Sequence, residues 1–176
     1  MGYDSEWLRD HVRSLPDYPK PGVTFKDITP VLAHPEALSA AIDAVTAPFA
    51  ACEIDKIIGI EARGFVFGAP AAYRLGAGFI PVRKPGKLPW EIEHETYALE
   101  YGTDRLEIHR DAIERGERVL IVDDVLATGG TAAATAKLVA KLGGELVGCA
   151  FFIELEFLNG RAQLEDTEVH SVLGYR

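Results

Sequence analysis

Residues 118–131 have the sequence RVLIVDDVLATGGT, and this stretch decides the expected fold. Its apolar run 119–122 suits a short strand that is buried on both faces of a parallel sheet. We expect the strand to stop at Asp123 and Asp124, and a Gly/Thr turn to lead into a helix over 131–142. Glycines let backbone N–H groups approach an anion, and a helix N-terminus favours negative charge. This order of elements therefore predicts a phosphate site at the carboxyl edge of an open sheet.

The two adjacent carboxylates need a role other than phosphate binding, because they would repel a phosphate. Sugar hydroxyls, or a magnesium ion carried by the same ligand, would suit them. A ribose 5-phosphate satisfies the whole motif, with its phosphate in the turn and its 2′- and 3′-hydroxyls on Asp123 and Asp124. Taken alone, the same residues are also compatible with a buried strand, two helix-capping acids and an ordinary strand–helix turn.

Several classes of ligand are disfavoured. The GxxxxGK[ST] loop of nucleotide hydrolases needs a lysine at the helix start, and none stands there. Gly129 and Gly130 do not form the GxGxxG pattern of a dinucleotide site. The formal net charge of −9 argues against a nucleic-acid surface, which is normally basic.

The length and the apolar pattern indicate one domain that spans residues 1–176 and lies in the cytoplasm. The longest apolar stretch, LVGCAFFI at 146–153, is far too short to cross a membrane. The charged N-terminus has no apolar core of a secretory signal. We expect Cys52 and Cys149 to be small buried hydrophobes in a reducing compartment, with a disulfide as the alternative.

Strands and helices alternate along most of the chain. This alternation predicts a doubly wound α/β fold, with an open, mostly parallel, twisted sheet flanked by helices. The N-terminal part differs: we expect a helix over 5–14 with Ser5 as its N-cap, and then an extended, proline-rich path over 18–32. The expected strands of the sheet are 56–60, 78–83, 119–122, 146–153 and an edge strand at 169–173, and a helix is expected over 35–49.

Cations follow two of these strands at the same sheet edge as the phosphate turn. Arg63 comes after the strand 56–60, and by itself it would be an ordinary surface arginine. Arg83, Lys84 and Lys87 follow the next strand, and a charge run usually marks a solvated face. Their position at this edge of an acidic protein favours a diphosphate partner instead.

The segment from Lys87 to about Glu95 has no clear period, which is typical of a lid. A lid would keep water away from a reactive sugar carbon. Residues 96–101 and 106–109 are expected to form short paired strands beyond it. His109 has no companion metal ligands at usable spacing, so we interpret it as structural.

The string IVDDVLATGGT resembles the signature of the type I phosphoribosyltransferases, in the version that the adenine-specific members carry. The segments VTFK at 23–26, EARG at 61–64 and YALEYG at 97–102 also resemble that family, in the family's order. The resemblance implies the type I phosphoribosyltransferase fold, with a small N-terminal hood at about 1–34 and a flexible lid loop at about 84–105. It also implies a cis peptide bond between Glu61 and Ala62.

The same resemblance implies the roles of individual residues. Glu100 in the lid would lie near the purine as a general acid or base, although a solvent-facing glutamate on a hairpin is the alternative. The phosphoribosyl group would be bound by Asp123, Asp124, Ala127, Thr128, Gly129, Gly130 and Thr131. The pyrophosphate would be bound by Arg63, Arg83, Lys84 and Lys87. Adenine would be bound by Val23, Thr24, Phe25, Lys26 and Leu155, with Phe25 and Leu155 covering its two faces.

The implied reaction is a purine-salvage step in which adenine and 5-phosphoribosyl 1-pyrophosphate give AMP and pyrophosphate. Mg²⁺ would be held mainly through substrate and water, with no direct protein ligand, and the enzyme would be a homodimer. Hypoxanthine–guanine relatives carry an aspartate where this chain has Ala127, which disfavours that branch. Xanthine, hypoxanthine or guanine as the base, or a non-catalytic regulator of the same fold, remain the alternatives. A regulator would usually add a DNA-binding module or a basic surface, and this chain has neither.

Overall fold

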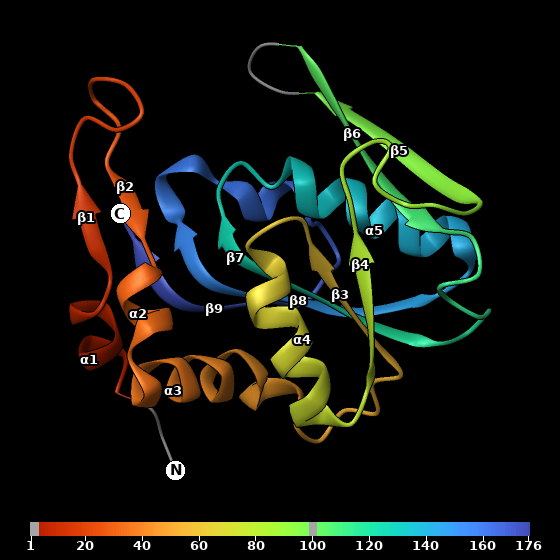
Figure 1. Cartoon of the computed structure of the whole chain (residues 1–176), viewed down its shortest axis with the longest axis horizontal. Coiled ribbons are helices and arrows are strands. Elements are labelled where there is room, and N and C mark those ends of the chain that lie inside the picture. The colour runs from red at the N-terminus through yellow and green to blue at the C-terminus, as the bar shows by residue number, and fades with distance from the viewer. Residues whose placement is uncertain (1–3, 99–101) are drawn as a thin grey trace. The chain divides into compact units, whose positions relative to one another are not determined.

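The computed structural model describes residues 4–98 and 102–176 and divides into two compact units, residues 1–44 and 45–176 (Figure 1). The prediction of a single domain with a hood over residues 1–34 stays a prediction. No helix among the described residues is long and apolar enough to cross a membrane.

The first unit begins with a helix and a small hairpin. Helix α1 covers Ser5–Asp10, and Asp4 caps it, because its carboxylate accepts the backbone N–H groups of Glu6 and Trp7 at 3.0 and 3.2 Å. The predicted cap at Ser5 and the predicted helix end at 14 were therefore wrong. An ionised cap suits the positive end of a helix, and the residues beyond Asp10 pair as a strand instead.

Strand β1 (Arg13–Leu15) pairs antiparallel with β2 (Phe25–Asp27). A short helix, α2, follows over Thr29–Ala33, so the predicted extended path contains two regular elements. The side chain of Asp27 starts this helix by accepting the Thr29 N–H at 2.9 Å. The predicted helix over 35–49 is confirmed as α3 (Pro35–Thr46), which continues into the 3₁₀ turn η1 (Ala47–Phe49).

The second unit is built on a five-stranded parallel sheet in the order β4-β3-β7-β8-β9, which confirms the predicted fold class (Figure 1). Numbered along the chain, this is the 2-1-3-4-5 order of a doubly wound sheet. The strands are β3 (Lys56–Ile60), β4 (Gly78–Val82), β7 (Arg118–Leu126), β8 (Glu145–Leu155) and β9 (Val169–Tyr175).

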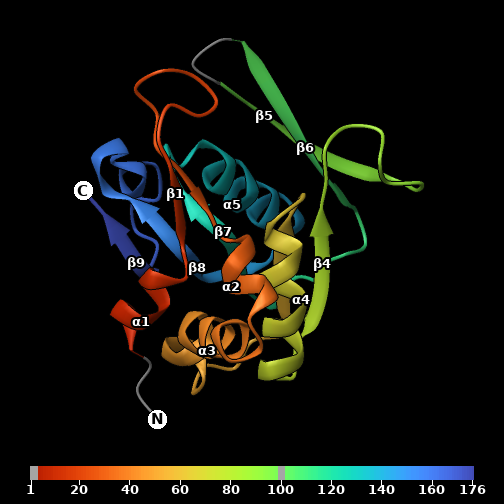
Figure 2. The same ribbon diagram turned by 60° about the vertical axis from the view of Figure 1, so that its left-hand side comes forward.

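Helices α4 (Gly64–Leu75) and α5 (Gly130–Leu142) cover opposite faces of this sheet (Figure 2). Neighbouring residues of β8 show the division, because Phe152 stacks on Phe67 of α4 at 5.3 Å between ring centroids, whereas Phe151 lies in the core beneath α5. Right-handed crossovers impose this arrangement, since the chain moves in opposite directions from β3 to β4 and from β7 to β8.

Small residues bring α4 against β3. A Cβ built on Gly68 would lie 3.0 Å from the Gly59 Cα, and one on Gly59 would lie 2.9 Å from the Gly64 carbonyl oxygen. Only hydrogen side chains permit such an approach. The N-terminus of α4 is thereby held directly beyond the carboxyl end of β3.

A hairpin of β5 (Ile92–Ala98) and β6 (Thr103–His109) lies along α5 (Figures 1 and 2). Glu95 is paired with Lys141 at 2.7 Å and with Lys137 at 3.5 Å, and both lysines belong to α5. The hairpin is therefore longer and more regular than the predicted irregular segment. Its register depends on a partner strand that lies further along the chain, which a local pattern does not report.

Three further expectations need correction. Strand β7 runs through Asp123 and Asp124 to Leu126, because β8 continues to supply a pairing partner beyond the aspartates. Strand β4 ends at Val82, and Arg83 instead forms an isolated bridge with Glu107. Both cysteines are free, but Cys52 is exposed, whereas burial raises the pKa of the Cys149 thiol to about 12.

Candidate functional site

The carboxyl ends of β3 and β7 form the switch point of the sheet, where the order of the strands reverses. Open parallel sheets bind ligands in the crevice outside this point. Strand β3 ends at Ile60, whereas β7 continues for several residues past Val122, its last residue that pairs with β3. The two aspartates therefore stand on an extension of β7 beside the loop that follows β3.

The predicted phosphate turn links β7 to α5. Gly129 is the N-cap of α5 with φ 85°, a left-handed conformation that favours glycine, and no side chain caps the helix there. The backbone also approaches the turn after β8, since a Cβ on Gly129 would collide with the Gly160 carbonyl oxygen. The first turn of α5 thus has no side-chain cap and begins at a tightly packed turn, and such a helix N-terminus favours an anion.

The aspartates differ in their surroundings. Asp124 is 5% exposed, and its carboxylate is paired with the Arg63 guanidinium from the start of α4. The Asp123 carboxylate lies against Gly64, where a Cβ would come within 2.7 Å of its Oδ1. Burial raises the pKa of Asp123, and the neighbouring negative charge of Asp124 raises it further.

The structure joins Arg63 to the sugar side of the predicted site through Asp124. Its predicted role at the pyrophosphate stays a prediction, and so does the ribose role of the two acids. The peptide bond between Glu61 and Ala62 is cis, which confirms that expectation.

Arg83 and the backbone of Lys84 converge on Glu61. The Arg83 guanidinium donates to the Glu61 carboxylate at 3.2 and 3.4 Å, and the Lys84 N–H donates to it at 2.9 Å. The hydrogen bond from the Lys84 backbone, assisted by Arg83, lowers the pKa of Glu61 in spite of some burial. The exposed Lys87 accepts a hydrogen bond from Arg83 through its carbonyl oxygen at 3.4 Å.

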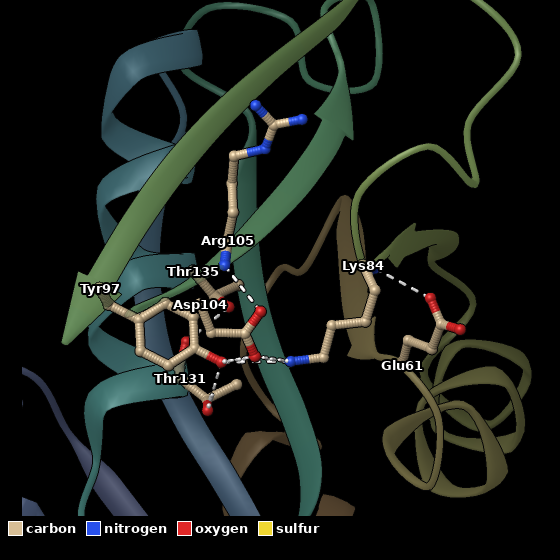
Figure 3. A network of polar contacts seen from close by, with 7 residues as sticks. All are labelled: Glu61, Lys84, Tyr97, Asp104, Arg105, Thr131 and Thr135. Carbon is tan, nitrogen blue, oxygen red and sulfur yellow. Dashed lines mark hydrogen bonds and ion pairs between the residues drawn. The ribbon is translucent and has the colours of Figure 1, made fainter. Parts of the chain in front are cut away.

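The Lys84 side chain lies away from Glu61 (Figure 3). Its ammonium is paired with Asp104 of β6 and lies 3.3 Å from the Tyr97 hydroxyl of β5. The Tyr97 hydroxyl in turn lies 3.3 Å from the Thr131 hydroxyl, at the start of α5. Lys84 was predicted to bind the pyrophosphate, and Thr131 was predicted to bind the phosphoribosyl group. The two residues are therefore joined through Tyr97 of the hairpin.

The residues predicted to bind adenine are divided between the two units. In the first unit, Phe25 contacts Tyr18 edge-on at 5.4 Å between ring centroids, and the Lys26 ammonium donates to the Ser14 hydroxyl at 2.9 Å. Leu155 ends β8 in the second unit. Their common contact with a base stays a prediction, as do the roles of Val23 and Thr24, and Glu100 lies outside the described residues.

The oxygen donors at this sheet edge suit a hard cation such as Mg²⁺, which keeps several water ligands and binds through one or two carboxylates and substrate phosphates. Asp123 and Asp124 stand on the strand that leads directly into the predicted phosphate turn. Within residues 4–98 and 102–176, no three His, Cys, Asp or Glu side chains form a group that could hold a metal ion.

Comparison with known proteins agrees with this geometry. A family model of the phosphoribosyl transferase domain matches residues 27–172. The adenine phosphoribosyltransferase of Koribacter versatilis is 58% identical over 168 residues, which cover 96% of this chain and 92% of that protein. The chain belongs to the adenine phosphoribosyltransferases.

Solved structures of adenine phosphoribosyltransferases have the same fold. The enzyme of Rhodothermus marinus is 57% identical and superposes with a TM-score of 0.93, covering 97% of this chain and 98% of that one. The enzyme of Saccharomyces cerevisiae, crystallised with D-2,5-dideoxy-2,5-imino-altritol 1,6-bisphosphate and adenine, is 42% identical with a TM-score of 0.90, covering 96% and 97%.

The sequence analysis assigned no role to three residues of this candidate site. The Glu61 carboxylate accepts hydrogen bonds from the Arg83 guanidinium and from the Lys84 backbone. Tyr97 and Asp104 contact the Lys84 ammonium. An acid directly after a buried strand is a usable signal, and it could have identified Glu61. Nothing local marks Tyr97 or Asp104, because their role depends on the pairing of β5 with β6 and on the approach of the hairpin to α5.

Proposed function

We propose that the protein transfers the 5-phosphoribosyl group from 5-phosphoribosyl 1-pyrophosphate to adenine and releases AMP and pyrophosphate. The observation that carries the proposal is the grouping at one switch point of a phosphate turn, two aspartates and a cation-bearing loop. Membership of the adenine phosphoribosyltransferases supports adenine as the base.

The reaction exchanges one bond at the anomeric carbon. A ring nitrogen of adenine forms a bond to C1 as the C1–O bond to the pyrophosphate breaks, and the ring loses a proton. The turn at 127–131 holds the 5-phosphate, and Asp123 and Asp124 hold the ribose hydroxyls, so that C1 alone moves between the two groups. Arg63, Arg83 and Lys87 neutralise the leaving pyrophosphate.

Glu100 manages the proton of the base, and the lid that contains it excludes water from a transition state with oxocarbenium character. Phe25 and Leu155 cover the faces of the purine, and the backbone of residues 23–26 reads its edge. Mg²⁺ bound to the substrate would supply further positive charge for the leaving pyrophosphate. The active form is a cytoplasmic homodimer, and the two free cysteines are consistent with a reducing compartment.

The first experiment identifies the base. Labelled adenine, hypoxanthine, guanine and xanthine are each incubated with 5-phosphoribosyl 1-pyrophosphate and Mg²⁺, and nucleotide products are separated. AMP should form from adenine at a rate far above that of any oxopurine product. Turnover of an oxopurine without AMP would reject adenine, and no turnover of any base would favour a non-catalytic regulator.

Two substitutions test the proposed roles. Glu100→Gln should lower kcat by about 10²-fold or more, the usual contribution of a general acid or base, with little change in the KM of the sugar substrate. An unchanged kcat would reject the proton role. Asp124→Asn should raise the Kd of ribose 5-phosphate, and an unchanged Kd would reject the assignment of its hydroxyls.

A further inference from the structure

The Tyr97 hydroxyl is the meeting point of three polar groups (Figure 3). It donates to Asp104 at 3.1 Å, it lies 3.3 Å from the Lys84 ammonium, and it accepts from the Thr131 hydroxyl at 3.3 Å. A single hydroxyl thus separates the Lys84 charge from the first turn of α5. Thr131 is itself tied into the helix, because its carbonyl oxygen accepts the Thr135 hydroxyl at 2.9 Å.

The Tyr97 ring has a defined position on the turn. A Cβ on Gly130 would lie 3.3 Å from the Tyr97 ring, and the strand that carries Tyr97 is tied to α5 by Lys141, which donates to the His94 carbonyl oxygen at 2.7 Å and pairs with Glu95 at 2.7 Å. Lys84 is thus linked to the turn through Tyr97, which the hairpin holds in place.

Arg83 and Lys84 are adjacent, but their side chains take different directions. Alternate residues of extended backbone point to opposite sides, and here Arg83 is directed to Glu61 beyond β3, whereas Lys84 is directed to Asp104 and Tyr97 beside α5. The two cations therefore serve different parts of the site.

The charge balance favours the same division. The phosphate turn offers N–H and hydroxyl dipoles but no full positive charge of its own, and Asp123 and Asp124 precede it. Hydrogen bonds with Asp104 and Tyr97 raise the pKa of Lys84, although burial alone would lower it, so the amine stays protonated. An ammonium next to the turn would offset the charge of a bound phosphate.

We propose that Tyr97 is a positioning residue that directs Lys84 to the 5-phosphate, so that Lys84 belongs to the phosphate turn and not to the pyrophosphate group. The proposal rests on the proposed function. In the absence of ligand, Asp104 neutralises the ammonium, and a phosphate in the turn shares it. Arg63, Arg83 and Lys87 remain the cations for the pyrophosphate.

Binding experiments without turnover test this division. Tyr97→Phe keeps the ring against Gly130 and removes only the hydroxyl, and Lys84→Met removes the charge. Calorimetry would measure the affinities of each variant for ribose 5-phosphate and for inorganic pyrophosphate. Tyr73→Phe serves as the matched control, because Tyr73 is 92% exposed on α4.

We expect Tyr97→Phe to weaken ribose 5-phosphate binding by about 3- to 10-fold, the usual effect of one hydrogen bond. Lys84→Met should weaken it by about 10- to 100-fold, as expected for a charge-assisted contact. The double variant should resemble Lys84→Met alone, because Tyr97 acts through Lys84. Pyrophosphate affinity should be unchanged in all three, and a melting curve verifies that each variant is folded.

Three results would overturn the proposal: a selective loss of pyrophosphate affinity, an affinity for ribose 5-phosphate equal to that of the unmodified protein, or fully additive effects in the double variant. Failure of the proposed function is distinguishable, since the unmodified protein would then neither bind ribose 5-phosphate nor form AMP. If the unmodified protein does both and the variants bind as it does, only the inference about Tyr97 fails.

Discussion

The Arg63 guanidinium is paired with the Asp124 carboxylate across the switch point, so the first residue before α4 is joined to the extension of β7. The Asp124 side chain is 7% exposed and that of Arg63 is 54% exposed. A nearly buried carboxylate next to a second one needs this positive charge, because an unpaired buried charge is strongly destabilising. The pair therefore both supports the fold and shapes the candidate site.

Removal of the Arg63 charge should destabilise the protein. For Arg63→Met we expect a loss of about 1–3 kcal/mol in the free energy of unfolding, below the range for fully buried pairs because Arg63 is half exposed. Asp124→Asn in the same chain should restore part of the loss, since the carboxylate charge that Arg63 offsets is then absent. Urea unfolding of the single and double variants measures the coupling, and strictly additive losses would contradict it.

Asp123 should limit stability at neutral pH. Its pKa is raised in the folded protein by burial and by Asp124, so it contributes stability that is present below its unfolded pKa of about 4 and lost as the pH rises through the folded pKa. A neutral amide side chain at this position would carry no such penalty. Asp123→Asn should therefore melt at least about 2 °C higher at pH 7–8, a shift that corresponds to roughly 0.5–1 kcal/mol at this size.

The difference in melting temperature should narrow toward pH 4, where both proteins carry a neutral side chain at this position. Ribose 5-phosphate affinity should fall in the same variant, if Asp123 holds a sugar hydroxyl. A variant that is less stable than the unmodified protein at pH 8, or a difference that does not depend on pH, would contradict the prediction.

The parts of this molecule that could be predicted are those that depend on residues close together in the sequence. The buried strand at 119–122, the Gly/Thr turn and the helix over 131–142 follow from local pattern, and all three are present. The shared pyrophosphate role of Arg83 and Lys84 stays a prediction. Their side chains take different directions because they are neighbours on extended backbone, which adjacency in sequence alone does not reveal. Tyr97 and Asp104 depend on a hairpin register and a helix contact, so their partners are set by tertiary structure.

Glu154 should provide stability that is lost in acid. Glu154 is 6% exposed, and its carboxylate accepts two hydrogen bonds of 2.7 Å from the Arg161 guanidinium. Hydrogen bonding from Arg161 is the main cause that lowers the pKa of Glu154, against the effect of burial. A lowered folded pKa gives stability that is present above the unfolded pKa of about 4.3 and lost as the pH falls through the folded value.

Glu154→Gln should accordingly cost about 1–3 kcal/mol at pH 7, the range for a hydrogen bond to a charged group. The cost should shrink as the pH falls below about 4. Denaturant unfolding of both proteins at a series of pH values measures it. Glu91→Gln is the matched control, because Glu91 is 67% exposed and pairs with Arg110 only at 3.9 Å, so its effect should stay within about 0.5 kcal/mol. An equal cost at pH 3 and pH 7 would reject the role given to ionised Glu154.

Gly160 should be required for the shape of the phosphate turn, although it is remote from it in sequence. A Cβ on Gly160 would collide with the Ala127 carbonyl oxygen, and its partner there is backbone that cannot rotate away. Gly160→Ala should therefore displace the turn that precedes α5 and lower the free energy of unfolding by about 2–4 kcal/mol. It should also weaken ribose 5-phosphate binding by about 10-fold or more.

Gly116→Ala is the matched comparison for this effect. Gly116 has φ 85° and no atom within 4 Å of a built Cβ, so alanine there brings backbone strain of about 1–2 kcal/mol without a collision. The affinity of the Gly116→Ala variant for ribose 5-phosphate should equal that of the unmodified protein. Urea unfolding and calorimetry on both variants separate strain from displacement of the turn, and comparable affinities in the two variants would show that Gly160 does not shape the phosphate site.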